Sequence, residues 1–376
     1  MIMKLAILGF GVVGGGVYQL ANEKNGLTTK AILERRPSPE RGSLTVTDFA
    51  KILEDPEIEI VAEAMGGLHP AFEYVSAAMK AGKHVVTSNK ALVAAYYNEL
   101  ITLAKEHGVA FRCTAAVGGG IPWLVNLERV ARMDTIKEIR GICNGTTNYI
   151  LDVMTRERRG FDEVLAEAQI LGYAEKDPTA DIDGWDIRRK LVISANIAFG
   201  VSIKEENVPM AGIRHIKAED IAAFTKHGLT CKMIASAKRS EGRLCASVEP
   251  TLLKAGDPEA SVPLNFNRIS LVAEALGPAS FFGQGAGRYP TAVNVVEDCI
   301  DIRNGCRSFY TDKADPCEID GSALRAYYVR AAKPADFADV KAGEMGAGIL
   351  TKPMPVAEMH RRAGAEDVFA ALPEEC

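Results

Sequence analysis

The sequence predicts an α/β protein, with a doubly wound parallel sheet at the N-terminus and an α+β domain after it. From residue 4 to residue 114, short apolar β-type runs alternate with helix-length amphipathic segments, which is the pattern of βαβ units in a parallel sheet. A glycine-rich turn follows the first run, and the alternation ends at a second glycine-rich loop. A chain of 376 residues is long enough for two or three domains.

Five apolar runs have the length and flanking residues of strands. They lie at residues 4–8, 29–33, 58–63, 84–87 and 109–113. Helices are predicted at residues 70–81 and 91–107, because each segment is amphipathic and is followed by the glycine that helix C-termini prefer (Gly82, Gly108). Five strands and four crossovers fit one doubly wound domain over residues 1–130.

The chain changes character at residues 117–122, a loop too rich in glycine for the interior of a helix or strand. Beyond this loop we predict an α+β domain over residues 131–310, with strands at 135–143 and 246–252 and helices at 161–171 and 185–199.

A second glycine cluster, Gly283 to Gly287, precedes a predicted helix at residues 291–302. Residues 286–310 are expected to pack back on the first domain. Residues 311–376 are weakly patterned, and we predict that they form a short tail.

Composition excludes several classes of protein. A net charge of −5 gives no general attraction to nucleic acid or to anionic membranes. Residues 1–20 superficially resemble a secretory signal, but their five glycines favour a strand and a phosphate-binding turn over a hydrophobic helix. The eight cysteines include no Cys-x-x-Cys pair, which argues against a zinc site or a disulfide scaffold. We therefore expect a cytoplasmic protein.

The first strand leads into a motif typical of dinucleotide-binding folds. Gly9, Gly11 and Gly14 have the G-x-G-x-x-G spacing, and Glu34 ends the second strand 20 residues later. The glycines permit a tight turn, close approach of a pyrophosphate and packing of the helix on the sheet, while the helix N-terminus attracts the phosphates. The motif predicts a Rossmann domain that binds NAD or NADP; the alternative is a structural glycine turn without a ligand.

Charged residues at the end of the second strand bear on the choice of cofactor. Glu34 is placed to accept a hydrogen bond from the ribose 2′-hydroxyl of NAD, whereas Arg35 and Arg36 are suited to the 2′-phosphate of NADP. A solvated charge run is a third interpretation. We slightly favour NADP.

Lys90 follows the carboxyl end of the predicted strand at residues 84–87, where open α/β sheets bind ligands. A lysine at this place can polarise a carbonyl group or contact the nicotinamide ribose. Taken alone, however, the position is better explained by a solvated lysine at the start of a helix.

The densest polar cluster, residues 172–190, runs into an apolar helix. Asp183 is a candidate N-cap with Asp186 as its capping-box partner, and Asp186 shares a helix face with Lys190 at i,i+4. The cluster can be interpreted in two ways, as residues that only cap the helix or as part of a functional site. Because the helix is apolar on nearly every face after Lys190, its first turn is expected to border a cavity.

Acidic groups around a partly buried lysine keep the lysine protonated, which suits a general acid for a carbonyl that becomes an alkoxide. Periodicity does not decide among Arg188, Arg189 and Lys190, but only lysine can give up its proton usefully. The six histidines show no metal spacing. Cys113 and Cys143 are candidates for a thiolate nucleophile, yet nothing near either residue marks it as activated, which favours inert, buried thiols.

The sequence resembles the homoserine dehydrogenase family over about residues 1–310. The stretches that carry the resemblance occur in the family's order, at residues 9–14, 55–67, 82–92, 117–122, 141–151, 167–190 and 285–292. The resemblance implies NAD(P)-dependent interconversion of aspartate 4-semialdehyde and homoserine, in the threonine, methionine and isoleucine pathway. It also implies a homodimer built through the second domain.

The resemblance assigns roles to individual residues. It makes Lys190 the acid that protonates the aldehyde oxygen, assisted by Lys90, with Asp181 and Asp186 orienting the substrate and the lysine. Glu175 holds the ammonium group of the substrate. The lining of the substrate pocket falls on Asn144, Thr146 and Thr147. The residues that it assigns to cofactor binding are Gly9, Phe10, Gly11, Val12, Val13, Gly14, Glu34, Arg35, Lys90 and Gly285.

The sequence departs from the family pattern in two places. Members often bind a sodium ion through a glutamate and through loop carbonyls, which here correspond to Val117, Gly119 and Ile121, but Thr114 replaces the glutamate and removes its charge. Many members also end in an ACT regulatory domain. Here residues 324–330 resemble its first strand, but the turn that usually follows is missing, so we expect a degenerate ACT-like tail.

Three alternatives remain open. The first is a related dehydrogenase for another small amino-acid aldehyde or ketone. The second is a catalytically silent nucleotide-binding regulator, and the third is a phosphorylating semialdehyde dehydrogenase that uses a thiolate. We expect the homoserine dehydrogenase reaction, because a silent regulator has no need for a costly acidic cluster around a buried lysine.

Overall fold

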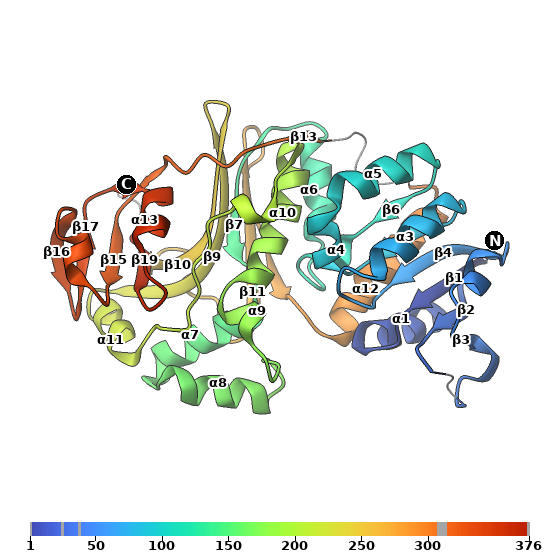
Figure 1. The fold of residues 1–376 in the computed structure, drawn as a ribbon, viewed down its shortest axis with the longest axis horizontal. Helices are drawn as coiled ribbons and strands as arrows, with labels where there is room; N and C mark the ends of the chain where they lie inside the picture. The colour runs from blue at the N-terminus through green and yellow to red at the C-terminus, as the bar shows by residue number, and fades with distance from the viewer. Residues whose placement is uncertain (1, 24–25, 37–38, 307–313, 374–376) are drawn as a thin grey trace. The chain divides into compact units, whose positions relative to one another are not determined.

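A computed structural model describes residues 2–23, 26–36, 39–306 and 314–373. The chain divides into two compact units (Figure 1). The first unit contains residues 1–133, 193–202 and 284–316, and the second contains residues 134–192, 203–283 and 317–376. Each unit is therefore completed by segments that lie far apart in the sequence.

The first unit contains the predicted doubly wound sheet. Six parallel strands have the order β3-β2-β1-β4-β5-β6. Their bounds are β1 (Met3–Leu8), β2 (Leu27–Leu33), β3 (Thr45–Val46), β4 (Ile58–Glu63), β5 (His84–Thr87) and β6 (Phe111–Arg112). The order reverses between β1 and β4, so the ligand crevice is expected at the carboxyl ends of these two strands. The α/β fold class is confirmed, with β3 as an additional edge strand.

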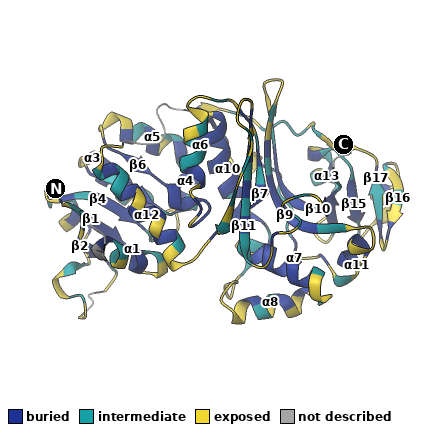
Figure 2. Cartoon of the chain, turned by 180° about the vertical axis from the view of Figure 1, so that it is seen from behind, coloured by how far each residue is buried: buried dark blue, intermediate teal, exposed yellow. Residues whose placement is uncertain are grey.

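Helices of the first unit surround this mostly buried sheet (Figure 2). They are α1 (Val12–Glu23), α2 (Ala50–Leu53), α3 (Ala71–Lys80), α4 (Lys90–Ala95), α5 (Tyr97–Glu106), α6 (Trp123–Ala131) and α12 (Arg288–Arg303). Apolar side chains of α12, including Ala292, Val295 and Cys299, share one core with the sheet and with Val17 and Ala21 of α1.

One predicted helix is two helices in the structure. The segment 91–107 is interrupted at Tyr96, whose backbone leaves the helical region (φ −122°, ψ 31°) between α4 and α5. The ring of Tyr96 stacks on Phe72 of α3, with 4.1 Å between the ring centroids. The break therefore accompanies a contact between helices, which the local sequence pattern does not encode.

The second unit is built on a nine-stranded sheet with the order β12-β11-β7-β9-β10-β19-β15-β17-β16. The first five strands in this order, from the β12 edge inward, include β7 (Ile136–Ile142), β9 (Leu229–Ser240), β10 (Arg243–Lys254), β11 (Phe266–Ala273) and β12 (Gly277–Gln284). The helices of this unit include α7 (Gly145–Glu157), α8 (Phe161–Ile170), α9 (Thr179–Ile182) and α11 (Ala218–Lys226). Helix α10 (Trp185–Phe199) begins in the second unit and ends in the first.

The tail folds as part of the second unit. Its sheet strands are β15 (Tyr327–Arg330), β16 (Lys341–Met345), β17 (Gly348–Thr351) and β19 (Val368–Ala371), with α13 (Val356–Arg362) before the last. Their spatial order, β19-β15-β17-β16, is that of a ferredoxin-like sheet, with the short 3-10 helix Pro334–Phe337 in place of the first helix. Despite its weak pattern, the segment has a core of its own around Tyr327, Phe337 and Met359.

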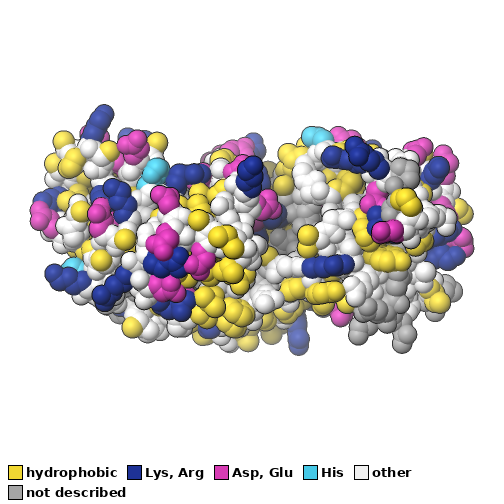
Figure 3. All heavy atoms as spheres, turned by 90° about the horizontal axis from the view of Figure 1, so that it is seen from below, with side chains coloured by type: hydrophobic (Ala, Val, Ile, Leu, Met, Phe, Trp, Pro, Cys, Tyr) yellow, Lys and Arg dark blue, Asp and Glu magenta, His cyan; other side chains and the backbone are white. Residues whose placement is uncertain are grey.

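Two short strand pairs lie outside the two large sheets. β8 (Val201–Ser202) pairs with β13 (Asp315–Pro316), and β14 (Leu324–Arg325) pairs with β18 (Met354–Pro355). No helix in the described ranges is long and apolar enough to cross a lipid bilayer. On the face drawn in Figure 3, basic and acidic side chains are interspersed, without a broad area of one sign.

Candidate active site

The turn between β1 and α1 has the geometry that a pyrophosphate requires. Gly9 has a φ of +90°, and a Cβ atom on Gly14 would lie 2.0 Å from the carbonyl oxygen of Gly9. A Cβ on Gly11 would meet nothing within 4 Å, so that side of the turn is open to a ligand. Helix α1 begins at Val12 and has no acidic residue in its first turn. Its N-terminal N–H groups and dipole can therefore attract phosphate.

The end of β2 holds an ion pair that local sequence did not reveal. Arg41 donates two hydrogen bonds to Glu34, at 3.2 Å from Nε and 2.6 Å from Nη2. The same guanidinium lies 4.1 Å from the ring centroid of Phe10, within the glycine turn. Arg35 and Arg36 are exposed. Arg41 lies in a loop without periodicity. Its positive charge is the only feature of the local sequence that could have indicated a role.

Lys90 is the first residue of α4, at the carboxyl end of β5. Its neighbour Asn89 caps this helix by accepting a hydrogen bond from the Leu92 N–H at 3.1 Å. The Asn89 side chain also donates to the carbonyl oxygen of Gly67 at 2.7 Å. The loops after β4 and β5 are thus tied together where Lys90 emerges.

Glu63, at the end of β4, organises the same loops and was not singled out from the sequence. It is fully buried and accepts hydrogen bonds from the Met65 N–H at 2.7 Å and from the Thr87 hydroxyl at 2.5 Å. Burial raises the pKa of Glu63, while these hydrogen bonds act in the opposite direction. We read Glu63 as a residue that shapes the crevice.

In the second unit, Lys190 lies within a buried polar cluster. Its ammonium nitrogen is 2.7 Å from Oδ2 of Asp186 and 2.7 Å from the carbonyl oxygen of Cys143, and the residue is 7% exposed. The i,i+4 spacing therefore brings the predicted carboxylate and lysine into contact. The Lys190 ammonium group thus has two acceptors, a carboxylate and a backbone carbonyl.

Asn144 joins the two aspartates of the cluster. Its side-chain nitrogen donates to Asp181 at 2.7 Å and to Asp186 at 2.9 Å. Its side-chain oxygen caps α7 by accepting from the Thr147 N–H at 2.8 Å. The Thr146 hydroxyl lies 3.1 Å from Asp181 and donates to the Tyr173 carbonyl at 2.6 Å. Four of the five predicted substrate residues thus meet here, with Asp186 and Lys190.

Two carboxylates in one cluster affect each other. Burial raises the pKa of Asp181, and the nearby charge of Asp186 raises it further, whereas the hydrogen bond from Asn144 lowers it. The cluster can therefore hold a cationic group at low cost, because such a group relieves the repulsion between the carboxylates. An ammonium group and an aldehyde oxygen are suitable partners for this arrangement.

The remaining predicted substrate residue lies at the surface. Glu175 is exposed, and within the described part of the chain no hydrogen bond or ion pair of its carboxylate is found. Its backbone carbonyl accepts from Gln169 at 3.0 Å. The structure fixes the backbone around Glu175 and leaves its carboxylate available to a ligand.

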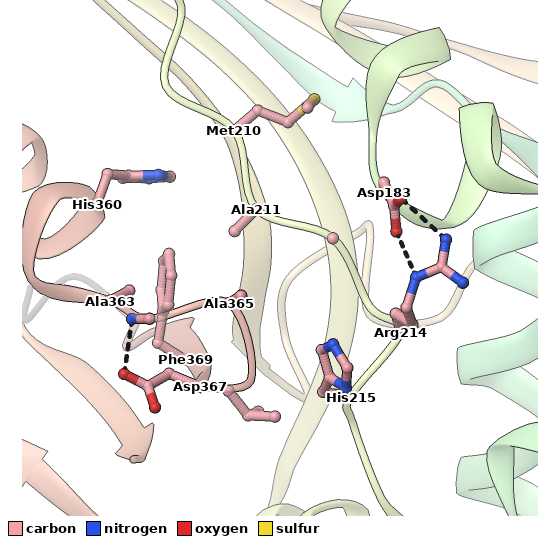
Figure 4. A pocket seen from close by; sticks show the side chains of 13 residues that line it. Asp183, Met210, Ala211, Arg214, His215, His360, Ala363, Ala365, Asp367 and Phe369 are labelled. Atoms are coloured by element: carbon pink, nitrogen blue, oxygen red, sulfur yellow. Dashed lines mark hydrogen bonds and ion pairs between the residues drawn. The ribbon is translucent and has the colours of Figure 1, made fainter. Parts of the chain in front are cut away.

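Asp183 does not form the predicted capping box. It follows α9 and is separated from α10 by Gly184, and its carboxylate accepts two hydrogen bonds from Arg214, both 2.9 Å. This pair lines a pocket of about 320 Å³ between the 210–215 loop and residues 360–369 of the tail (Figure 4). Arg214 thus anchors the turn between α9, which carries Asp181, and α10, which carries Asp186.

The two cysteines tested as nucleophiles are both buried. Burial raises the pKa of the Cys143 thiol to about 12, so it is protonated at neutral pH. Cys143 contributes its backbone carbonyl to Lys190 instead. This geometry argues against a thioester mechanism.

The glycine-rich loop and the second glycine cluster meet in the first unit. A Cβ on Gly119 would lie 2.5 Å from the backbone of Gly285, so the absence of a side chain at Gly119 permits the close approach of these two segments. Asn294 of α12 donates a hydrogen bond to the carbonyl oxygen of Gly119 and another, at 3.3 Å, to that of Ile121. Asn294 was not predicted as a site residue.

The chain is similar to known homoserine dehydrogenases. Residues 9–114 match the family model of the homoserine dehydrogenase NAD-binding domain, and residues 122–300 match that of homoserine dehydrogenase. The homoserine dehydrogenase of Synechocystis is 41% identical over 318 residues, covering 80% of this chain and 73% of that protein. The enzyme of Bacillus subtilis is 37% identical over 319 residues, covering 81% and 74%.

Solved structures give the same result. A homoserine dehydrogenase from Thiobacillus denitrificans superposes with a TM-score of 0.89 and 30% identity, covering 100% of this chain and 99% of that one. A hyperthermophilic archaeal homoserine dehydrogenase in complex with NADPH superposes with a TM-score of 0.69 and 26% identity, covering 81% and 98%. The chain therefore belongs to the homoserine dehydrogenase family, a family of NAD(P)-dependent oxidoreductases.

Proposed function

We propose that this chain reduces L-aspartate 4-semialdehyde to L-homoserine with NADPH, and that Lys190 is the general acid. The observation that carries this proposal is the buried Lys190 ammonium, held by Asp186 and by the Cys143 carbonyl, 2.7 Å from each. The reaction belongs to threonine, methionine and isoleucine biosynthesis. A spectrophotometric assay of aspartate semialdehyde with NADPH and with NADH, run separately, tests substrate, cofactor and competence together.

The residues divide the chemistry between them. Reduced nicotinamide, when bound, supplies the hydride that attacks the aldehyde carbon. Lys190 gives its proton to the aldehyde oxygen as negative charge develops there, and the neutral amine regains a proton from water. Asp186 holds Lys190 in place through their ion pair. By resemblance to the family, we assign Lys90 at the start of α4 the role of assisting Lys190.

The substrate is recognised by its ammonium and carbonyl groups. We assign the ammonium to Glu175, with Asp181 as a second anionic partner, because both residues come from the acidic segment before α10. We assign the lining of the pocket to Asn144, Thr146 and Thr147 at the start of α7: Asn144 and Thr146 donate hydrogen bonds to Asp181, and the Thr147 N–H donates to Asn144. An isosteric substrate without an ammonium group would leave these acids unpaired and should be rejected.

The pattern of charge near β2 supports NADP over NAD. Glu34 is neutralised by Arg41, so its carboxylate is less available to a ribose 2′-hydroxyl. Arg35, Arg36 and Arg41 together offer positive charge for a 2′-phosphate. We include no sodium ion in the mechanism, because the groups around Gly119 and Ile121 do not fit one, as their contacts with Asn294 indicate.

We also propose a homodimer formed through the β11–β12 part of the sheet. Val272, Leu276 and Phe282 are large apolar residues of this region that are exposed, at 37%, 55% and 54%. The buried Nε groups of Arg140 and Arg268, on the neighbouring strands, have no hydrogen-bond acceptor in the described part of the chain. A partner that covers this face would bury the apolar side chains and supply acceptors.

Light scattering coupled to size exclusion tests the dimer. We expect a mass near twice the 40.5 kDa of one chain. Phe282→Asp should shift it to the monomer, whereas Val293→Asp, a matched change at an exposed position of α12, should not. A monomeric natural protein would contradict the proposal. The enzyme is expected in the cytoplasm, where its cofactor and pathway are found.

Two alternative functions make different predictions. A dehydrogenase for another small amino-acid aldehyde or ketone would turn over that compound faster than aspartate semialdehyde. A silent regulator would bind NADPH without any turnover. The contact between Lys190 and Asp186 favours a catalyst over both a regulator and a thiol-dependent enzyme, which would be inactivated by alkylation of a thiolate.

A further inference from the structure

The loop around Gly119 carries carbonyl groups that the family resemblance assigns to a sodium ion. That donor set would consist of the side chain at position 114 and the carbonyls of Val117, Gly119 and Ile121. In this chain the side chain is the neutral Thr114, which brings no charge to the site. The affinity of a site for hard cations depends largely on charged oxygen ligands. Without a carboxylate at position 114, this donor set therefore lacks its strongest ligand.

Two of the three carbonyls already face a donor. Asn294 is 6% exposed, and its side-chain nitrogen hydrogen bonds to the oxygens of both Gly119 and Ile121. The orientation of the amide follows from chemistry, because its oxygen would repel two carbonyl oxygens. A cation bridging these oxygens would need the place that the amide nitrogen holds, since both groups bring positive charge to the same pair of acceptors.

Thr114 is engaged elsewhere as well. Its N–H and its hydroxyl donate to the carboxylate of Asp298, at 2.9 Å and 2.7 Å. Asp298 is 2% exposed and also accepts a hydrogen bond at 3.0 Å from Nε of the buried Arg112. The Asp298 carboxylate is therefore engaged by Thr114 and by Arg112, which also pairs with Asp301, rather than turned toward the loop carbonyls.

We propose that the side-chain amide of Asn294 substitutes for a bound cation, so that the glycine-rich loop keeps its shape without sodium. The loop needs such a tie, because Gly119 has a φ of +55° and lies against the backbone of Gly285. Asn294 is a positioning residue: it touches the loop and neither the proposed substrate nor the reacting atoms. The proposal concerns stability first, so it stands or falls separately from the proposed reaction.

The first test compares salts with the natural full-length protein. Thermal unfolding and NADPH oxidation are measured in sodium chloride, potassium chloride and choline chloride at equal ionic strength. We expect the same melting temperature and the same turnover in all three. A clear rise in melting temperature or a several-fold activation by sodium or potassium over choline would overturn the proposal.

The second test removes the donor. Asn294→Asp replaces the amide by a carboxylate of the same shape, which faces two carbonyl oxygens. Loss of the two hydrogen bonds should lower the folded-to-unfolded ratio by roughly tenfold or more in choline chloride. Sodium should restore part of this loss, because a cation can now bridge the three oxygens. The control is Asn304→Asp, the same change at an exposed position at the end of α12, which should show neither effect.

The third test rebuilds the charged donor set. In Thr114→Glu/Asn294→Ala, the amide is absent and an acid is present, so the melting temperature should rise with sodium but not with choline. This variant keeps the proposal testable if Asn294→Asp does not fold. An Asn294→Ala variant as stable as the natural protein in choline chloride would contradict the proposed tie.

Discussion

A lysine at position 190 decides what chemistry the acidic cluster can perform. Arg188 and Arg189 precede it on the same helix, but a guanidinium cannot give up a proton at neutral pH, whereas an ammonium can. The structure places Lys190, and only this member of the three, against Asp186 and the Cys143 carbonyl among the contacts described. A lysine in this contact can donate a proton, whereas an arginine in the same place could only bind an anion.

The role of Glu175 can be separated from that of Lys190 by steady-state kinetics. Glu175→Ala removes a charge from a side chain that makes no described contact, so folding should be unaffected. The substrate KM should rise by roughly tenfold or more, the loss expected for one charge-assisted contact, with little change in kcat. Glu206→Ala, at another exposed acid, serves as a control. An unchanged KM would remove Glu175 from the ammonium site.

Arg41 provides a test of cofactor choice. Arg41→Ala removes the partner of Glu34 and one cation near the expected 2′-phosphate. The ratio of kcat/KM for NADPH to that for NADH should fall by roughly tenfold, because one charge-assisted hydrogen bond is lost and the carboxylate is released. Arg132→Ala, at an exposed arginine of the same unit, should leave the ratio unchanged. A ratio that does not move would show that Arg41 only pairs with Glu34.

The local sequence identified site residues that belong to short motifs. It missed residues whose contact partners lie far away in the sequence. Gly9, Asp186 and Lys190 belong to short patterns with a clear chemical meaning. Arg41 and Asn294 act through contacts with Glu34 and with the Gly119 loop, and no periodicity or spacing connects these pairs. The misread Asp183 has the same cause, because its partner Arg214 lies 31 residues away.

At the scale of elements, helix α12 packs on α1 through glycine. A Cβ on Gly16 would lie 2.9 Å from Cβ of Ala292 and 2.9 Å from the carbonyl oxygen of Arg288. The two helices can therefore approach closely only because Gly16 has no side chain. This contact joins the C-terminal part of the first unit to the nucleotide-binding helix.

Gly16→Ala should destabilise the first unit by about 1–3 kcal/mol, the cost of overpacking a tight contact. Urea unfolding measures the stability of the variant. A separate titration with NADPH measures its affinity for the cofactor. Gly160→Ala is a suitable control, because Gly160 has a negative φ (−77°) and a Cβ there would meet nothing within 4 Å. Equal stability of the two variants would show that the contact between α1 and α12 has room for a methyl group.

Elements were predicted well where the pattern is local. The strands of the parallel sheet are nearly continuous apolar runs, and β4 and β5 have the predicted bounds. The division into α4 and α5 coincides with the stacking of Tyr96 on Phe72, which belongs to another helix. Helix α7 was missed because its buried first turn is polar: Asn144 to Asn148 serve the cluster and the loop at residues 262–266 rather than an apolar core.

For the second unit as a whole, two buried carboxylates join the tail to the rest. Asp220 of α11 accepts hydrogen bonds from Tyr328 at 2.6 Å and from Arg330 at 2.8 Å, both on β15. Burial alone would raise the pKa of Asp220, but these hydrogen bonds bring it below its usual value. Glu249 of β10 behaves in the same way, because burial is outweighed by hydrogen bonds from His360 and Arg325.

The sign of the resulting pH dependence follows from linkage. A carboxylate with a lowered pKa in the folded state stabilises the protein above its unfolded pKa, and this stability is lost as pH falls toward the folded pKa. Unfolding monitored from neutral to acidic pH should therefore show a loss of stability that begins near pH 4, around the ordinary carboxyl pKa values. Asp220→Asn should be less stable at neutral pH and show a flatter acid limb; an identical acid limb would contradict the assignment.

The central claim is best tested by the aspartate semialdehyde reductase activity of Lys190→Ala, with NADPH affinity measured in parallel by fluorescence. Removing a general acid should lower kcat by roughly 10²–10⁴-fold, because proton transfer to the developing alkoxide is lost. NADPH binding should be unchanged, since its glycine turn belongs to the first unit and Lys190 to the second. Lys190→Arg keeps the charge but cannot donate usefully, so it should be nearly as slow. Turnover near that of the natural protein in either variant would contradict the account.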